Sequence, residues 1–148
     1  MEDCTLCKIV SGKLPAFRIY EDNYAVAFLD IYPNVKGQAL VVPKKHVGSY
    51  IFDLDDSEIH AILISAKQAV KILEKGLGTN WVNIAFEGLD VNHLHAKLYP
   101  CIGMQRFKHM VAQQMVYFDT YPGYMTTLMG PRAKDEELKK LQDQILGK

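Results

Sequence analysis

Several features are scarce in this sequence of 148 residues, and each absence excludes a class of protein. No apolar stretch approaches the roughly 20 residues of a membrane-spanning helix, so we expect no membrane partner. Lys and Arg together number 17, as do Asp and Glu, so there is no net positive charge to attract nucleic acid. The acidic start Met-Glu-Asp-Cys lacks the apolar core of a signal peptide, so we expect a cytoplasmic protein.

Cysteines are also few, numbering three, but two of them are closely spaced: Cys4 and Cys7 are separated by two residues. In a reducing compartment this spacing indicates a metal or redox motif more often than a structural disulfide. A redox motif begins a helix that follows a strand, and the three residues before Cys4 leave no room for one. The pair therefore predicts metal binding.

The pattern of apolar residues predicts an α+β domain. Asp55 and Glu58 form a capping box at the start of an amphipathic helix over residues 57–76, which Gly76 is expected to end. A second amphipathic pattern predicts a helix over residues 135–146. Short apolar runs between turn residues predict strands at 19–21, 24–29, 39–42, 81–86 and 93–99. We expect a five-stranded antiparallel sheet with one main helix and a C-terminal tail that ends in a helix.

The apolar pattern weakens after Pro100, which suggests how the chain is organised. A length of this size fits one domain with its own core. We expect residues 1–100 to form the domain and residues 101–148 to form a C-terminal extension packed on it. Arg132 in this extension is a candidate phosphate contact, although an exposed arginine beside the last helix is the simpler interpretation.

Two histidines lie two positions apart in the predicted strand 93–99, and a lysine follows at the same spacing. Residues two apart on a strand face the same side, so His93, His95 and Lys97 are expected to form one row. A lone histidine on a strand is usually structural. Two on one face beside a lysine instead indicate a cationic or metal-binding row.

Tetrahedral zinc takes four nitrogen or sulfur ligands, and the cysteine pair supplies two of them. The sequence leaves two ways to complete the set. Either His46 and one histidine of the row bind the metal, or His93 and His95 both bind it. In the second case no imidazole of the row remains for chemistry.

Several segments of the sequence resemble the histidine triad (HIT) family. They are the opening at residues 4–15, the stretch 20–33 and the stretch 37–46, which ends in Pro-Lys-Lys-His. The family's pattern of three histidines alternating with apolar residues falls on residues 93–97, with lysine in the third place. The resemblance covers about residues 4–100 and is to a zinc-bearing, bacterial-type member. It implies the HIT-like fold, a purine or other nucleotide as substrate, and a homodimer.

The resemblance also implies the metal ligands and the nucleophile. Zinc-bearing relatives hold the metal with the cysteine pair, the histidine after the Pro-Lys strand and the first triad histidine. By position these are Cys4, Cys7, His46 and His93, which implies a structural zinc. His95 then serves as the nucleophile that attacks an α-phosphorus. The implied activity is nucleotide hydrolysis or nucleotidyl transfer; the alternative is a nucleotide-binding or sensing protein with weakened catalysis.

Further positions are assigned to nucleotide binding by the same resemblance. Asp30 matches the acid that accepts hydrogen bonds from the ribose hydroxyls. Ile19, Phe28 and Ile31 match positions that enclose the base, although composition alone makes Phe28 a core residue. Asn92, just before the first triad histidine, is expected to donate to the phosphate.

Three departures from the family pattern bear on the substrate. Lys97 replaces the third histidine and is assigned a catalytic role, because an ammonium donates to phosphate oxygens and favours a neutral His95. Gln38 replaces a histidine that usually follows the glycine before the Pro-Lys strand. The loop before His93 is short and carries Asp90, whose carboxylate would repel a phosphate.

Overall fold

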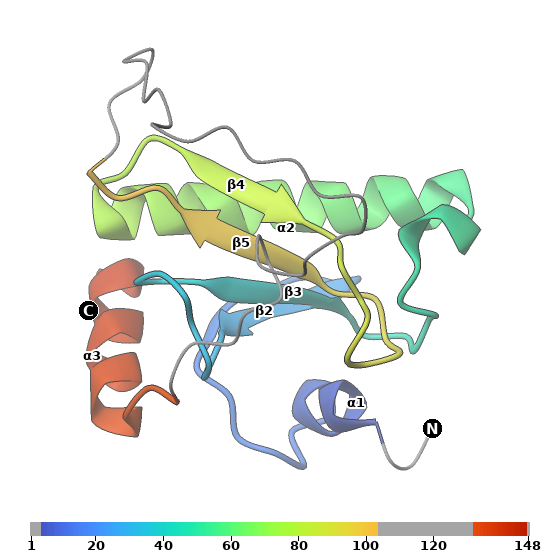
Figure 1. Ribbon diagram of the computed structural model, residues 1–148, viewed down its shortest axis with the longest axis horizontal. Coiled ribbons are helices and arrows are strands. Elements are labelled where there is room, and N and C mark those ends of the chain that lie inside the picture. Colours follow the sequence, from blue (N-terminus) through green and yellow to red (C-terminus); the bar gives the residue numbers. More distant parts are fainter. Residues whose placement is uncertain (1–3, 104–131, 148) are drawn as a thin grey trace, which may run out of the picture.

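The structure, a computed structural model, describes residues 4–103 and 132–147. A five-stranded antiparallel sheet runs through the molecule in the order β1-β2-β3-β5-β4 (Figure 1). The strands are β1 (Arg18–Glu21), β2 (Ala25–Leu29), β3 (Ala39–Pro43), β4 (Val82–Ala85) and β5 (Ala96–Pro100). The α+β fold with five antiparallel strands, predicted from the apolar pattern, is thereby confirmed.

The main helix, α2 (Asp56–Leu77), begins as its capping box predicts. The Asp55 carboxylate accepts a hydrogen bond from the backbone N–H of Glu58 at 2.8 Å, which satisfies one of the donors that a helix start leaves unpaired. The predicted end of the helix is wrong, because Gly78, with a left-handed φ of 65°, ends it instead of Gly76.

Gly76 lies inside α2 for a packing reason. A Cβ atom on Gly76 would lie 2.2 Å from the Cα of Ile145, which belongs to the last helix, α3 (Asp135–Leu146). The two helices therefore approach each other more closely than any side chain on residue 76 would allow. Gly76, which the sequence analysis took as the end of the helix, is instead the residue of α2 against which α3 packs.

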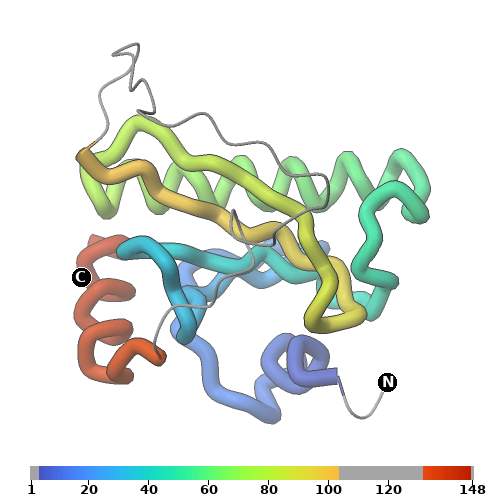
Figure 2. The backbone as a smooth tube through the Cα atoms, viewed as in Figure 1, coloured from blue at the N-terminus to red at the C-terminus, as the bar shows by residue number. Residues whose placement is uncertain are grey.

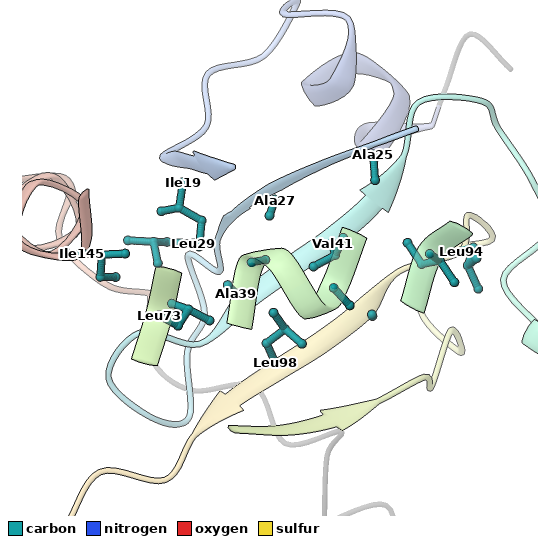
Figure 3. Close-up of a cluster of buried hydrophobic side chains, with 14 of the residues drawn as sticks. Ile19, Ala25, Ala27, Leu29, Ala39, Val41, Leu73, Leu94, Leu98 and Ile145 are labelled. Atoms are coloured by element: carbon teal, nitrogen blue, oxygen red, sulfur yellow. The ribbon is translucent and has the colours of Figure 1, made fainter. Parts of the chain in front are cut away.

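Apolar side chains lie on both faces of the sheet, so β2 is buried on both sides. Ala25, Ala27 and Leu29 join the larger core cluster, which α2 and α3 cover (Figure 3). Val26 and Phe28 point to the other face and pack in a smaller cluster. That cluster is completed by Val42 and by Leu6 of the short helix α1 (Thr5–Val10). Figure 1 shows α1 and α2 on opposite sides of the sheet.

One carboxylate ties the turn between β1 and β2 to the main helix. Asp22 accepts hydrogen bonds from the backbone N–H groups of Tyr24 and Ala25 at 2.8 and 2.7 Å. It also accepts from the hydroxyl of Ser65 in α2 at 2.7 Å and from that of Tyr20 at 2.9 Å. These contacts fix how the first hairpin sits on α2.

The strand predicted at residues 93–99 begins three residues later, so His93 and His95 lie in the loop before β5. Their backbone hydrogen bonds explain the difference. The N–H of Leu94 donates to Val47 and that of His93 donates to Val91, neither of which belongs to β3. This segment therefore leaves the ladder before the histidines.

The C-terminal helix packs against α2 and β1. The backbone N–H of Ala133, just before α3, donates to the carbonyl of Ile31 at 2.9 Å. Within the part of the chain that the structure describes, no helix combines the length and apolar character needed to cross a membrane.

Candidate functional site

The four residues predicted to bind metal meet on the face of the sheet that α1 covers. Nδ1 of His93 lies 3.4 Å from Sγ of Cys4 and 3.4 Å from Sγ of Cys7, and Nδ1 of His46 lies 3.3 Å from Sγ of Cys7. All four ligand atoms lie within 4.8 Å of one another. Sulfur and nitrogen ligands around a tetrahedral zinc ion lie about 3.5 Å apart, so this donor set fits zinc.

Local structure brings the thiols and imidazoles together. Cys4 is the N-cap of α1, and its Sγ accepts a hydrogen bond from the N–H of Cys7, which places both thiols at the first turn. His93 is fully buried, and its Nε2 donates to the carbonyl of Pro43 at 3.1 Å. A backbone acceptor on the far nitrogen is the usual way in which a metal-binding imidazole is oriented.

The protonation states also suit metal binding. Burial lowers the pKa of His93, which outweighs the opposing effect of its hydrogen bond to Pro43, so the imidazole is neutral near pH 7. Burial and the neighbouring Cys4 raise the pKa of the Cys7 thiol when no metal is bound. Metal binding would therefore release protons from the thiols.

His95 is nearly buried and has one ring nitrogen committed. Its Nδ1 donates to the backbone carbonyl of His93 at 2.8 Å, which leaves the lone pair on Nε2. Burial lowers the pKa of His95 and outweighs the opposing effect of its hydrogen bond to the His93 carbonyl. The charge of Lys97 lowers the pKa further, while Glu87 and Asp30 raise it to a smaller extent. The imidazole is thus held in the neutral tautomer that a nucleophile requires.

Lys97 is paired with a carboxylate that the sequence analysis did not identify. Its Nζ lies 2.6 Å from Oε2 of Glu87, and the two side chains are 14% and 8% exposed. Glu87 follows β4 two residues after Ala85, which lies opposite Lys97 in the sheet. That register is the signal that could have identified Glu87, because residues two apart share a face.

The expected row of His93, His95 and Lys97 is preserved although its first two members precede β5. Leu94 and Leu98 are both buried in the core cluster under α2. Ala96 between them is buried in the same cluster, and Nδ1 of His93 faces the cysteines beside α1. The alternation therefore continues through the loop and places His95 and Lys97 on the α1 side.

Asp30 stands at the end of β2 with its carboxylate oriented by two donors. Oδ1 accepts from the N–H of Tyr32 at 2.8 Å, and Oδ2 accepts from the side-chain amide of Gln38 at 2.7 Å. Gln38 is buried and its own Oε1 accepts from the N–H of Asn34. Gln38, which departs from the family pattern, thus fixes the position of Asp30. Both line a hollow of about 320 Å³ between this turn and α3.

The remaining residues predicted to bind the nucleotide do not all lie on the same face of the sheet. Ile31 is partly exposed in the turn after Asp30. Phe28 lies on the α1 side of the sheet, where Leu40 separates it from Lys97 across the strands. Ile19 instead packs into the core cluster on the α2 side.

Asn92 is exposed and its side-chain oxygen is already used. It accepts a hydrogen bond from the N–H of Ser49 at 3.1 Å, which leaves its amide N–H groups as the donors for a phosphate. The same two loops meet at Gly88, where a Cβ would lie 2.6 Å from the Cβ of Ser49. Figure 2 shows this segment between β4 and β5 passing beside α1. Asp90 in the same loop is exposed.

Arg132 is exposed and forms an ion pair with Asp135 at 2.8 Å. It therefore lies at the start of α3, as its simpler interpretation predicted. The stretch from Tyr121 to Thr127, which resembles tails of some relatives, lies outside the described residues.

Comparison with known proteins gives a consistent picture. The profile described as "HIT domain" matches residues 11–100. An uncharacterized HIT-like protein of Methanocaldococcus jannaschii is 40% identical over 102 residues, which are 66% of this chain and 78% of the relative. The adenosine 5′-monophosphoramidase of Saccharomyces cerevisiae is 35% identical over 100 residues, 66% of this chain and 61% of the relative. A crystal structure of a zinc-bound histidine triad family protein from Mycobacterium smegmatis has a TM-score of 0.61 at 22% identity and covers 99% of this chain and 95% of its own.

Proposed function

Because this chain belongs to the HIT domain family, we propose that it hydrolyses or transfers a nucleotide at an α-phosphate, through a nucleotidyl-histidine intermediate on His95. The observation that carries this proposal is the buried, neutral imidazole of His95, whose Nδ1 donates to the carbonyl of His93. The activity of the yeast relative supports a nucleoside 5′-phosphoramidate as the substrate class.

In the proposed first step, Nε2 of His95 attacks the α-phosphorus. A phosphorus–nitrogen bond to His95 forms as the bond to the leaving group breaks. The leaving amine departs with the electron pair and takes up a proton, and the water that attacks in the next step gives one up. The imidazole gains positive charge in the first step, and the hydrogen bond from Nδ1 to the His93 carbonyl stabilises that charge. Water then attacks the phosphorus, releases the nucleotide and returns His95 to its neutral form.

The nucleotide would be held by the turn that ends β2. Asp30, oriented by Gln38, is proposed to accept hydrogen bonds from the ribose hydroxyls. Phe28 and Ile31 are proposed to provide apolar surface for the base, whereas Ile19 is buried in the core cluster on the other face of the sheet and is not proposed to touch it. The amide of Asn92 is proposed to donate to the phosphate.

Zinc in this proposal is structural. Four protein ligands would close its coordination, so it would keep no position for substrate or water. The ion would fix α1 to the loops that carry His46 and His93, and through His93 it would steady the backbone to which His95 is hydrogen-bonded.

Replacing His95 tests the activity. We expect His95→Ala to abolish hydrolysis of adenosine 5′-monophosphoramidate, because the phosphorus loses its nucleophile, while AMP binding measured by calorimetry changes by less than about tenfold. His60→Ala is the matched control, since His60 is exposed on α2. Equal turnover in wild type and His95→Ala would exclude the catalytic role.

A second candidate is a nucleotide-binding or sensing protein with weakened catalysis. The observation that favours it is the replacement of the third histidine by Lys97, whose charge is matched by Glu87. This function predicts tight AMP binding by the wild type without turnover of any phosphoramidate.

A homodimer is also proposed, as in the family. In the described sheet β4 is an edge strand; Ile84 on it is 43% exposed, and Trp81 just before it is 45% exposed. Leu63 and Ile64 on α2 are exposed as well. Sedimentation at micromolar concentration should give twice the chain mass of 16.8 kDa.

A further inference from the structure

The ion pair between Lys97 and Glu87 is unusual for its burial. The other lysine–glutamate pairs described in this chain have the lysine side chain at least 36% exposed, whereas here it is 14% exposed and its partner 8%. The two charges come from different segments, β5 and the loop after β4, and lie 2.6 Å apart. The fold therefore brings two charged groups together where little water reaches them.

Stability alone is a weak reason for such an arrangement. Removing two charges from water costs several kcal/mol, and apolar residues of similar size usually stabilise a fold as well or better. The neighbouring cross-strand residue on the same face is Leu40, which shows that apolar side chains fit there. The pair is therefore better explained by what it does for a bound anion.

Lys97 also lies two residues from the proposed nucleophile and on the same face of the sheet. A lysine side chain is long and flexible, and its ammonium can sample many positions. The contact with the Glu87 carboxylate restricts the ammonium to one of them.

We propose that Glu87 is a positioning residue, which holds the Lys97 ammonium where a phosphate oxygen of the substrate binds. Lys97 and Glu87 then act as one unit in place of a third imidazole. This inference rests on the proposed function, because it assigns roles within the same reaction.

Removing Lys97 and removing Glu87 should have different effects, because the two side chains carry opposite charges. Without Lys97, a buried carboxylate remains in the phosphate site and repels the substrate. Without Glu87, the positive charge remains and still attracts the phosphate, but the ammonium loses the carboxylate that orients it. Loss of Lys97 should therefore weaken binding, whereas loss of Glu87 should slow the reaction.

Four zinc-loaded variants test these expectations, with AMP binding measured by calorimetry and adenosine 5′-monophosphoramidate hydrolysis by steady-state kinetics. We expect Lys97→Met to weaken AMP binding at least about tenfold, and Lys97→Met with Glu87→Gln to recover most of that loss. We expect Glu87→Gln to lower kcat about tenfold with little change in KM. Lys97→His with Glu87→Gln should be more active than Lys97→Met with Glu87→Gln.

The matched control is Glu58→Gln, which breaks the exposed pair between Lys45 and Glu58. It should leave kcat, KM and AMP binding unchanged. Thermal denaturation of every variant identifies any that fails to fold. A purely structural pair would change the unfolding temperature and leave kcat and AMP affinity equal in all folded variants, which would overturn the inference.

Nuclear magnetic resonance of the lysine ammonium groups gives a readout that needs no turnover. We expect a protected Lys97 ammonium signal that is lost in Glu87→Gln and shifts when inorganic phosphate or AMP is added. If phosphate shifts this signal but the wild type neither binds nor hydrolyses a nucleotide, the proposed function fails and the positioning role stands. If the enzyme is active and neither ligand shifts the signal, the positioning role fails and the function stands.

Discussion

The balance between burial and hydrogen bonding determines the pKa of single residues in this protein. Burial alone would raise the pKa of Asp22, but hydrogen bonds from Ala25, Ser65, Tyr20 and Tyr24 outweigh it and lower the pKa. His95 shows the opposite balance, since burial dominates and lowers its pKa. Each side chain is thus held near pH 7 in the form that its partners can use.

Asp22 should make stability depend on pH. Its pKa is lower in the folded chain than the unfolded value of about 3.9, so its contribution is present above that value and is lost as pH falls through the folded pKa. We expect Asp22→Asn to lower the free energy of unfolding at pH 7 by about 1–3 kcal/mol and to flatten its decline in acid.

Urea denaturation between pH 7 and pH 3 measures this effect. Asp53→Asn is the matched control, because Asp53 is exposed and its side chain is outside the Asp22 contacts. If Asp22→Asn and Asp53→Asn lose the same stability at every pH, the hydrogen bonds to Asp22 do not contribute as the structure indicates.

Residue spacing predicted part of the site, and contacts across the fold supplied the rest. Cys4 and Cys7 are close in sequence, so their spacing indicated a metal or redox motif, and their position after only three residues favoured metal. Glu87 and Gln38 could not be recognised in the same way. Glu87 reaches Lys97 through strand register, and Gln38 reaches Asp30 through the shape of an intervening turn. Neither geometry follows from residue types.

Among the elements, apolar alternation located the strands but not where β5 begins. Leu94 and Leu98 alternate with polar residues across the whole segment, so the pattern does not distinguish the loop from the strand. The difference lies in hydrogen-bond partners, and the N–H of Leu94 bonds to Val47 outside the sheet. The short α1 was not predicted either, because a helix of this length depends on its cap and on the packing of Leu6.

Gly76→Ala should loosen the contact between α2 and α3. Alanine is favoured over glycine inside a helix by about 1 kcal/mol, but its Cβ would lie 2.2 Å from the Cα of Ile145. Because backbone cannot move aside as a flexible side chain can, we expect a net loss of about 1–3 kcal/mol and faster amide hydrogen exchange in α3.

Hydrogen exchange measured by mass spectrometry checks this prediction, with Gly48→Ala as the control. Apart from its chain neighbours, the nearest described atom to a Cβ on Gly48 would be Oδ1 of Asn92, at an ordinary 3.9 Å. Unchanged exchange in α3 of Gly76→Ala would mean that the two helices do not pack as closely in solution.

At the scale of the whole molecule, the two faces of the sheet differ in the side chains that they carry. The face toward α2 is filled by the main apolar cluster, while the face toward α1 carries Cys4, Cys7, His46 and His93. The cluster of possible metal ligands joins residues far apart in sequence: Cys4 and His93 are separated by 89 positions, and Cys7 and His46 by 39. A metal there would cross-link the molecule as a disulfide would.

The double variant Cys4→Ser with Cys7→Ser should therefore lose zinc and stability together. We expect about one zinc per chain in wild type and none in the variant, with a markedly lower unfolding temperature, because a structural zinc site contributes directly to folding. Metal analysis and thermal denaturation of protein purified without added zinc measure both. Cys101→Ser is the control, since Cys101 lies outside the cluster. Full zinc content and stability in the double variant would rule out this ligand set.

The position of His93 between the cysteine pair and His95 links the state of the thiols to the position of the His95 ring. The ring of His93 faces the cysteine pair while its carbonyl holds the ring of His95, so one residue belongs to both groups. If zinc occupies this cluster, a chelator that removes it or an oxidant that consumes the thiols would free the His93 ring and loosen the backbone that holds His95. Under the proposed function, either reagent would lower the activity without reacting with His95 itself.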